Sequence, residues 1–177
     1  MQNLSKAERE KNKQNIMRKN FRYNRYMALR YALALFFFTN LYWFFLTREG
    51  VLAWVIPVSL ILLSIPAAVE HVKLYGDESK EINKQLKFNH FYYYIQIIVN
   101  FVMLIIVITG LGYGTMFPFL TTVIGAKIMM AAVLIVGALL SLFCIKRIIL
   151  IKTNTDKHYK RVKEFEGAQT PKTRKIK

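Results

Sequence analysis

The segment Phe91–Leu111, FYYYIQIIVNFVMLIIVITGL, decides how this chain folds, because it carries no charged residue along its whole length. A helix needs about 20 predominantly apolar residues to cross a hydrocarbon core about 30 Å thick. Lipid offers no hydrogen-bond partner to an exposed backbone, so a segment that crosses a bilayer in this way must be helical. The segment therefore predicts a transmembrane helix.

Three further runs of comparable length contain at most one charged residue each: Met27–Leu46, Val51–Val69 and Thr122–Ile145. Arg30 and Lys127 are the two charges, and each lies close enough to an end of its run for a long side chain to reach the interface. We therefore predict an all-α integral membrane protein with four transmembrane helices arranged as two helical hairpins.

The predicted organisation has three parts. Residues 27–145 form the transmembrane domain, with spans at about 27–46, 51–69, 91–111 and 122–145. Residues 1–26 form a basic arm before it, and residues 146–177 form a basic tail after it. Ser5 and Glu8 have the spacing of a capping box, which predicts a helix that starts near Lys6. A comparable short amphipathic helix is expected after the fourth span and should end at Gly167.

The distribution of basic residues predicts the orientation. The arm holds eight Lys or Arg residues against two acids, and the tail holds eleven against three. The connection 70–90 holds four, whereas 47–50 holds one and 112–121 holds none. Because basic residues accumulate on the cytoplasmic side, we expect a multi-pass protein of the cell membrane with both termini in the cytoplasm. The bias toward Lys, Asn, Ile, Tyr and Phe suits an AT-rich bacterial genome.

Basic and aromatic residues alternate in Asn20–Tyr31, NFRYNRYMALRY, at the start of the first predicted span. Such a mixture occurs on nucleic-acid stacking surfaces, but it is also typical of the belt at which a span meets lipid headgroups. We expect the arms to contact anionic lipid at the cytoplasmic face, and a membrane-protein partner or a second copy to complete the assembly. No nucleic-acid partner is expected.

Three amides lie deep in the predicted spans: Asn40, Gln96 and Asn100. Amides hydrogen-bond across helices, and small residues let helix backbones approach closely. We expect these amides to hold the bundle together, with a polar lining for a substrate path as the alternative. The fourth span carries a candidate helix-packing seam of smaller residues, which should pack within the bundle or against a partner: Ala126, Val133, Gly137 and Ser141.

The turn after Phe91–Leu111 contains Gly112, Tyr113 and Gly114, with Pro118, Thr121, Gly125 and Lys127 following. This order resembles the pore region of potassium channels, which implies a re-entrant filter whose backbone carbonyls coordinate an ion. Thr115 stands where that family has an acidic residue, and the preceding run is long enough to cross the bilayer outright. We therefore predict a helix that ends near Gly110–Gly112 and a compact turn through Pro118.

We predict no catalytic residue, cofactor or metal site. The strongest enzyme-like group is Glu70, His71 and His90, at the two ends of one connection, but its spacing is not that of a metal site. The expected function is therefore that of a non-enzymatic accessory or scaffold subunit, acting through helix packing and the basic arms. The alternatives are a small oligomeric transporter or cation channel, and a membrane-surface enzyme that uses residues 70–90.

Overall fold

The computed structural model describes residues 5–47, 51–76, 86–157, 159 and 160. Regular structure in these ranges is helical, and its elements are α1 Lys6–Leu46, α2 Val51–Gly76, α3 Lys87–Thr109, α4 Tyr113–Met116 and α5 Ile124–Lys152. The predicted all-α class is therefore confirmed for the described part of the chain.

Four helical segments of the described chain are long and apolar enough to cross a membrane: Tyr23–Leu46, Ala53–Leu74, Lys87–Thr109 and Ile124–Lys152. This agrees with the predicted four spans and with a multi-pass membrane protein. Two helices run further than the predicted spans at their C-terminal ends, because each continues through further apolar residues that pack in the core, Leu74 in α2 and Ile148 and Ile151 in α5. α2 ends at Gly76 rather than Val69, and α5 ends at Lys152 rather than Ile145.

The predicted capping box is present at the start of α1. The backbone N–H of Ser5 donates to Glu8 Oε2 at 2.9 Å, and the backbone N–H of Glu8 donates to Ser5 Oγ at 3.4 Å. From this cap the helix continues without interruption to Leu46, so the N-terminal helix and the first span are one element rather than two. The predicted tail helix lies mostly beyond Lys160, outside the described residues.

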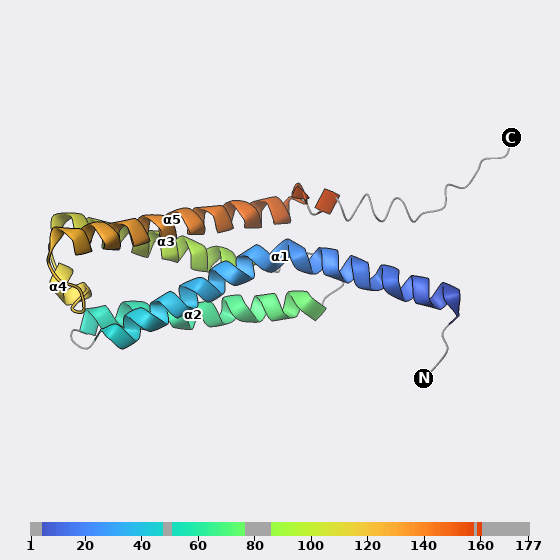
Figure 1. Cartoon of the computed structure of the whole chain (residues 1–177), viewed down its shortest axis with the longest axis horizontal. Coiled ribbons are helices and arrows are strands. Elements are labelled where there is room, and N and C mark those ends of the chain that lie inside the picture. Colours follow the sequence, from blue (N-terminus) through green and yellow to red (C-terminus); the bar gives the residue numbers. More distant parts are fainter. Residues whose placement is uncertain (1–4, 48–50, 77–85, 158, 161–177) are drawn as a thin grey trace.

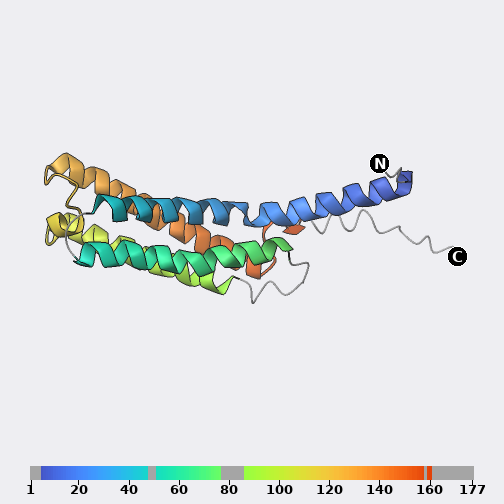
Figure 2. The ribbon, with the colours of Figure 1, turned by 90° about the horizontal axis from the view of Figure 1, so that it is seen from below.

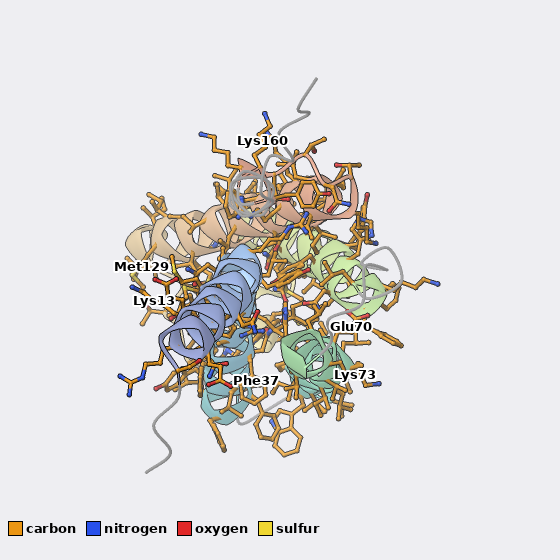
Figure 3. All side chains as sticks on the ribbon, turned by 90° about the vertical axis from the view of Figure 1, so that its right-hand side faces the viewer. Lys13, Phe37, Glu70, Lys73, Met129 and Lys160 are labelled. Carbon is orange, nitrogen blue, oxygen red and sulfur yellow. The ribbon has the colours of Figure 1, made fainter. Side chains whose placement is uncertain are left out.

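The long helices pack in a ring, with α1 against α2, α2 against α3, α3 against α5, and α5 against α1 (Figures 1 and 2). The ends joined by α4 lie together on the left of Figure 1, and the N-terminal part of α1 extends past the other helices on the right. Viewed along the longest axis of the molecule, the long helices surround a shared interior (Figure 3).

Two apolar clusters fill the interior, one toward each end. The cluster toward the α4 end is built on Met103, Val107, Tyr113, Phe117 and Leu134. The other cluster runs from Phe36, Tyr92 and Tyr93 to Ile148 and Ile151. Between them, the interior positions of α1, α3 and α5 are taken by Asn40, Gln96, Asn100 and Gly137. The packing therefore isolates a polar layer at mid-height in the bundle.

Candidate functional site

The polar layer is a chain of amide hydrogen bonds. Asn40 Nδ2 of α1 lies 3.5 Å from Gln96 Oε1 of α3 and donates to it, and Gln96 Nε2 donates to Asn100 Oδ1 at 3.2 Å. All three side chains are buried, with exposed fractions of 3%, 4% and 6%. Since α1 and α3 are not neighbours in the ring, the Asn40–Gln96 bond crosses the interior and ties two opposite helices together.

The chain ends against α5. A Cβ built on Gly137 would lie 2.8 Å from Asn100 Nδ2, so only a glycine lets the amide approach this closely. Ser141 is buried one turn further along and donates its hydroxyl to the Gly137 carbonyl at 2.9 Å. Asn100 Nδ2 itself has no hydrogen-bond partner among the described atoms. The layer is thus closely packed on α5, with one donor left over.

The predicted seam on α5 is only partly in the interior. Ser141 is fully buried, Gly137 contacts Asn100, and Ala126 is half-buried. Val133 is 51% exposed and lies outside the seam, while Leu134 is buried. Neighbouring helical residues differ by about 100° around the axis, so a one-position error in the assumed face exchanges these two side chains.

The Gly-Tyr-Gly segment forms a closed turn after α3. Gly110 and Gly112 adopt left-handed conformations, with φ of 76° and 72°, and these end α3 and start α4. Tyr113 is 1% exposed, its ring lies 5.6 Å from that of Phe117, and its hydroxyl donates to the Thr121 carbonyl. The prediction of a helix that ends near Gly110 and a compact turn is confirmed.

Three backbone carbonyls of the filter-like segment accept hydrogen bonds within this turn. The Gly110 carbonyl accepts from Tyr113 N, the Gly112 carbonyl accepts from Thr115 and Met116 N, and the Tyr113 carbonyl accepts from Phe117 N at 2.8 Å. α3 also runs unbroken through 23 residues before the turn, so it does not turn back halfway. Three of the carbonyls are therefore already engaged, and the described segment lacks the short pore helix that the resemblance implies.

Glu70 closes the start of α3. Its carboxylate accepts hydrogen bonds from the backbone N–H of Phe88 at 3.0 Å and of Asn89 at 2.9 Å. It also accepts from Asn89 Nδ2 at 2.9 Å, while α3 has no side-chain cap of its own. The carboxylate therefore acts as a cap supplied by another helix, and it benefits from the positive end of the helix dipole.

The two histidines of the enzyme-like group have separate surroundings. His71 is 5% exposed, and its backbone carbonyl accepts a hydrogen bond from Arg30 at 3.2 Å. His90 packs its ring edge-on against Tyr94, with 4.9 Å between ring centroids. Among the described residues, no three His, Cys, Asp or Glu side chains lie close enough together to hold a metal ion.

A buried ion pair that sequence reasoning missed joins α1 to the residues after α5. Arg25 Nε donates to Asp156 Oδ1 at 2.9 Å, and the side chains are only 5% and 0% exposed. The same guanidinium donates to the Ile151 carbonyl and to Asn154 Oδ1, both at 2.9 Å, and lies over the Tyr159 ring. The only hint in the sequence is that Asp156 is the first of three acids in a tail that holds eleven basic residues.

The chain after α5 folds locally in a way that holds Asp156 in position. Asn154 takes a left-handed conformation, with φ of 56°, which turns the chain back after α5. Asp156 Oδ2 accepts from the backbone N–H of Tyr159 at 3.2 Å, so the carboxylate caps the next turn while it holds Arg25. At 1.5 Å per residue, Arg25 lies about 30 Å along α1 from Leu46, which is close to one hydrocarbon thickness.

Comparisons of the chain with protein-family models, with curated proteins and with solved structures found no match.

Proposed function

We propose that the protein is a multi-pass protein of the cell membrane with both termini in the cytoplasm, and that it serves as a non-enzymatic accessory or scaffold subunit. The orientation rests on the basic residues, of which eight lie in the first 26 residues and eleven after Ile145. The scaffold role rests on how the bundle positions these two basic segments relative to each other.

The observation that carries the proposal is the buried pair of Arg25 and Asp156. It fixes the first residues after α5 against α1 at the point where the N-terminal part of α1 leaves the bundle (Figure 2). Both basic segments therefore start from one corner of the same end. A membrane anchor that presents two basic segments from one fixed corner is suited to holding an anionic partner at the membrane surface.

The polar groups of the bundle support a structural role. Asn40, Gln96 and Asn100 bond mainly to one another, which is the behaviour of residues that hold helices together. Glu70 is engaged as the cap of α3, which supports the non-enzymatic part of the proposal. Anionic lipid is expected near Tyr23, where the first apolar segment begins.

Purification from native membranes in a mild detergent tests the proposal. We expect the protein to elute with a larger membrane complex in fixed stoichiometry. Asp156→Ala should weaken that complex, while Glu10→Ala, which removes an exposed acid from the arm, should leave it intact. A protein that is strictly monomeric in membranes, with no partner retained, would contradict the scaffold role.

One observation favours a second candidate, a small oligomeric transporter or cation channel. Asn100 Nδ2 is buried at mid-height in the bundle without a hydrogen-bond partner among the described atoms, and such a donor is costly unless something binds it. Purified protein in liposomes decides between the two. Potassium or sodium flux that Asn100→Leu abolishes would support the transporter, and the absence of flux supports the scaffold.

A further inference from the structure

The N-terminal part of α1, residues Lys6–Arg22, is called the arm here, and it extends beyond the other helices (Figures 1 and 2). Every described side chain between Glu8 and Asn20 is exposed, so none of them packs on the bundle. The end-on view shows Lys13 on the outer surface, pointing away from the helices (Figure 3). The arm is thus a helix whose described surface meets no other part of the described chain.

One face of the arm combines positive charge with apolar surface. Arg9, Lys13, Ile16 and Met17 follow one another at helical spacing. The Ile16 side chain is 59% exposed and that of Met17 is 37% exposed. A basic helix with apolar residues on the same face is suited to binding an acidic partner that also offers apolar surface.

The direction of the arm disfavours lipid as its partner. The arm continues α1 away from the bundle, and Lys13 precedes the first residue of the apolar segment, Tyr23, by about 15 Å of helix. Electrostatic attraction to a headgroup layer falls off within a Debye length, which is about 8 Å at physiological ionic strength. Lys6 and Arg9 lie further out still, beyond effective reach of the membrane surface.

A second copy of this chain is also a poor partner for this face. Two such rows would bring Arg9 and Lys13 close to the same residues of the other copy, and like charges repel. The chain offers few acids to compensate, since its formal net charge is +16. The face therefore needs a partner with negative charge of its own.

We propose that the face formed by Arg9, Lys13, Ile16 and Met17 binds an acidic, amphipathic segment of another protein. This inference rests on the scaffold role proposed above and names the chemistry of the partner. Carboxylates of the partner lie along the basic half of the row, and its apolar side chains cover Ile16 and Met17. Binding adds contacts to a helix whose Asn12, Asn15 and Asn20 are weak helix formers.

Site-specific photocrosslinking in the native host tests the proposal with the full-length chain. A benzophenone amino acid is placed at Ile16 in one variant and at Asn15, which faces about 100° away, in the matched control. We expect one protein adduct from position 16, at a segment rich in Asp and Glu, and little or none from position 15. Equal adducts from both positions, or adducts with lipid or nucleic acid, would overturn the proposal.

Charge reversal makes the test specific. Arg9→Glu with Lys13→Glu should reduce the adduct from position 16 by about tenfold, which corresponds to about 1.4 kcal/mol. Changing two acids of the crosslinked segment to Lys should restore it. An adduct that survives the reversal, or a reversal that the partner change does not rescue, contradicts the charge pairing. If the complex co-purifies but position 16 gives no adduct, this inference fails and the scaffold role stands; if no complex exists, the scaffold role fails as well.

Discussion

The guanidinium of Arg25 donates to the carboxylate of Asp156 at 2.9 Å across 131 positions of sequence, and water reaches almost nothing of either side chain. A buried ion pair is not in itself strong stabilisation, because taking two charges out of water is costly. However, removing either partner leaves the other as a buried, unpaired charge, which is strongly destabilising. The pair therefore commits the residues after α5 to one place on α1.

The pair of Arg25 and Asp156 is predicted to be necessary for the stability of the fold. Asp156→Ala leaves a buried, unpaired guanidinium and should lower the free energy of unfolding by about 3–5 kcal/mol. Thermal unfolding in lipid nanodiscs measures the loss, with Lys157→Ala as the exposed neighbour that should change little. Arg25→Met combined with Asp156→Leu should recover most of it. A double variant as unstable as Asp156→Ala would contradict the assignment.

Asn40 is predicted to stabilise the contact between opposite helices. Asn40→Leu breaks the bond to Gln96 and should cost about 0.6 to 1.7 kcal/mol, the range found for polar contacts between membrane helices. The adjacent Thr39→Val is the matched control, because Thr39 is exposed and, among the described residues, its hydroxyl donates to Leu35 of its own helix. Steric-trapping or denaturant unfolding in detergent compares the two. Equal losses would show that position 40 has no special contact.

Gly137 is predicted to be intolerant of a methyl group. Gly137→Ala places a Cβ 2.8 Å from Asn100 Nδ2, and the forced shift should cost about 1–3 kcal/mol. Gly125→Ala is in the same helix, where nothing lies within 4 Å of the added Cβ, and it should be neutral or slightly stabilising. The difference in melting temperature between the two alanine variants is the measurement. A stabilised Gly137→Ala variant would mean that Asn100 does not approach α5.

The turn after α3 provides a matched pair of glycines. A Cβ meets open space at both Gly112 and Gly114, but only Gly112 has a positive φ, of 72°. Gly112→Ala should therefore cost about 1 kcal/mol through backbone strain, while Gly114→Ala should cost nothing. Neither variant should change potassium permeability in liposomes. Equal sensitivity of the two glycines, together with potassium flux in the parent protein, would revive the filter.

Glu70 is predicted to hold the first turn of α3. Glu70→Ala removes the acceptor for the N–H groups of Phe88 and Asn89 and should cost about 0.5–2 kcal/mol, the usual range for a lost cap. Amide hydrogen exchange should accelerate at these two positions. Lys73→Ala, which changes an exposed side chain on the same helix, serves as the control (Figure 3). Unchanged exchange at Phe88 would contradict the cap.

The main elements could be predicted from the sequence because bilayer thickness imposes a length on them. Phe91–Leu111 is uncharged over that length, and the structure has α3 at Lys87–Thr109 with Gly110 ending it. The capping box of Ser5 and Glu8 was equally visible, since both partners lie within four residues. The structure confirms both features, because each depends only on residues that are close together in the sequence.

Contacts that depend on tertiary packing could not be predicted in this way. Nothing in the chain marks Asp156 as the partner of one particular basic residue among the eight in residues 1–26. Glu70 caps a helix that starts seventeen positions later, across residues 77–85, which lie outside the described ranges. Leu134 rather than Val133 faces inward because of the rotation of α5, which only its neighbours determine.

Both basic segments are proposed to leave the bundle on the cytoplasmic side, and cysteine labelling tests this orientation most directly. Cys144 is buried and is the chain's single cysteine, so a Cys144→Ala background accepts one new cysteine at a time. Intact cells are treated with a membrane-impermeant maleimide after Lys13→Cys, Lys157→Cys or Thr121→Cys substitution. We predict that Thr121→Cys alone is labelled, and that the other two react only after permeabilisation. Labelling of Lys13→Cys or Lys157→Cys in intact cells would contradict the claim.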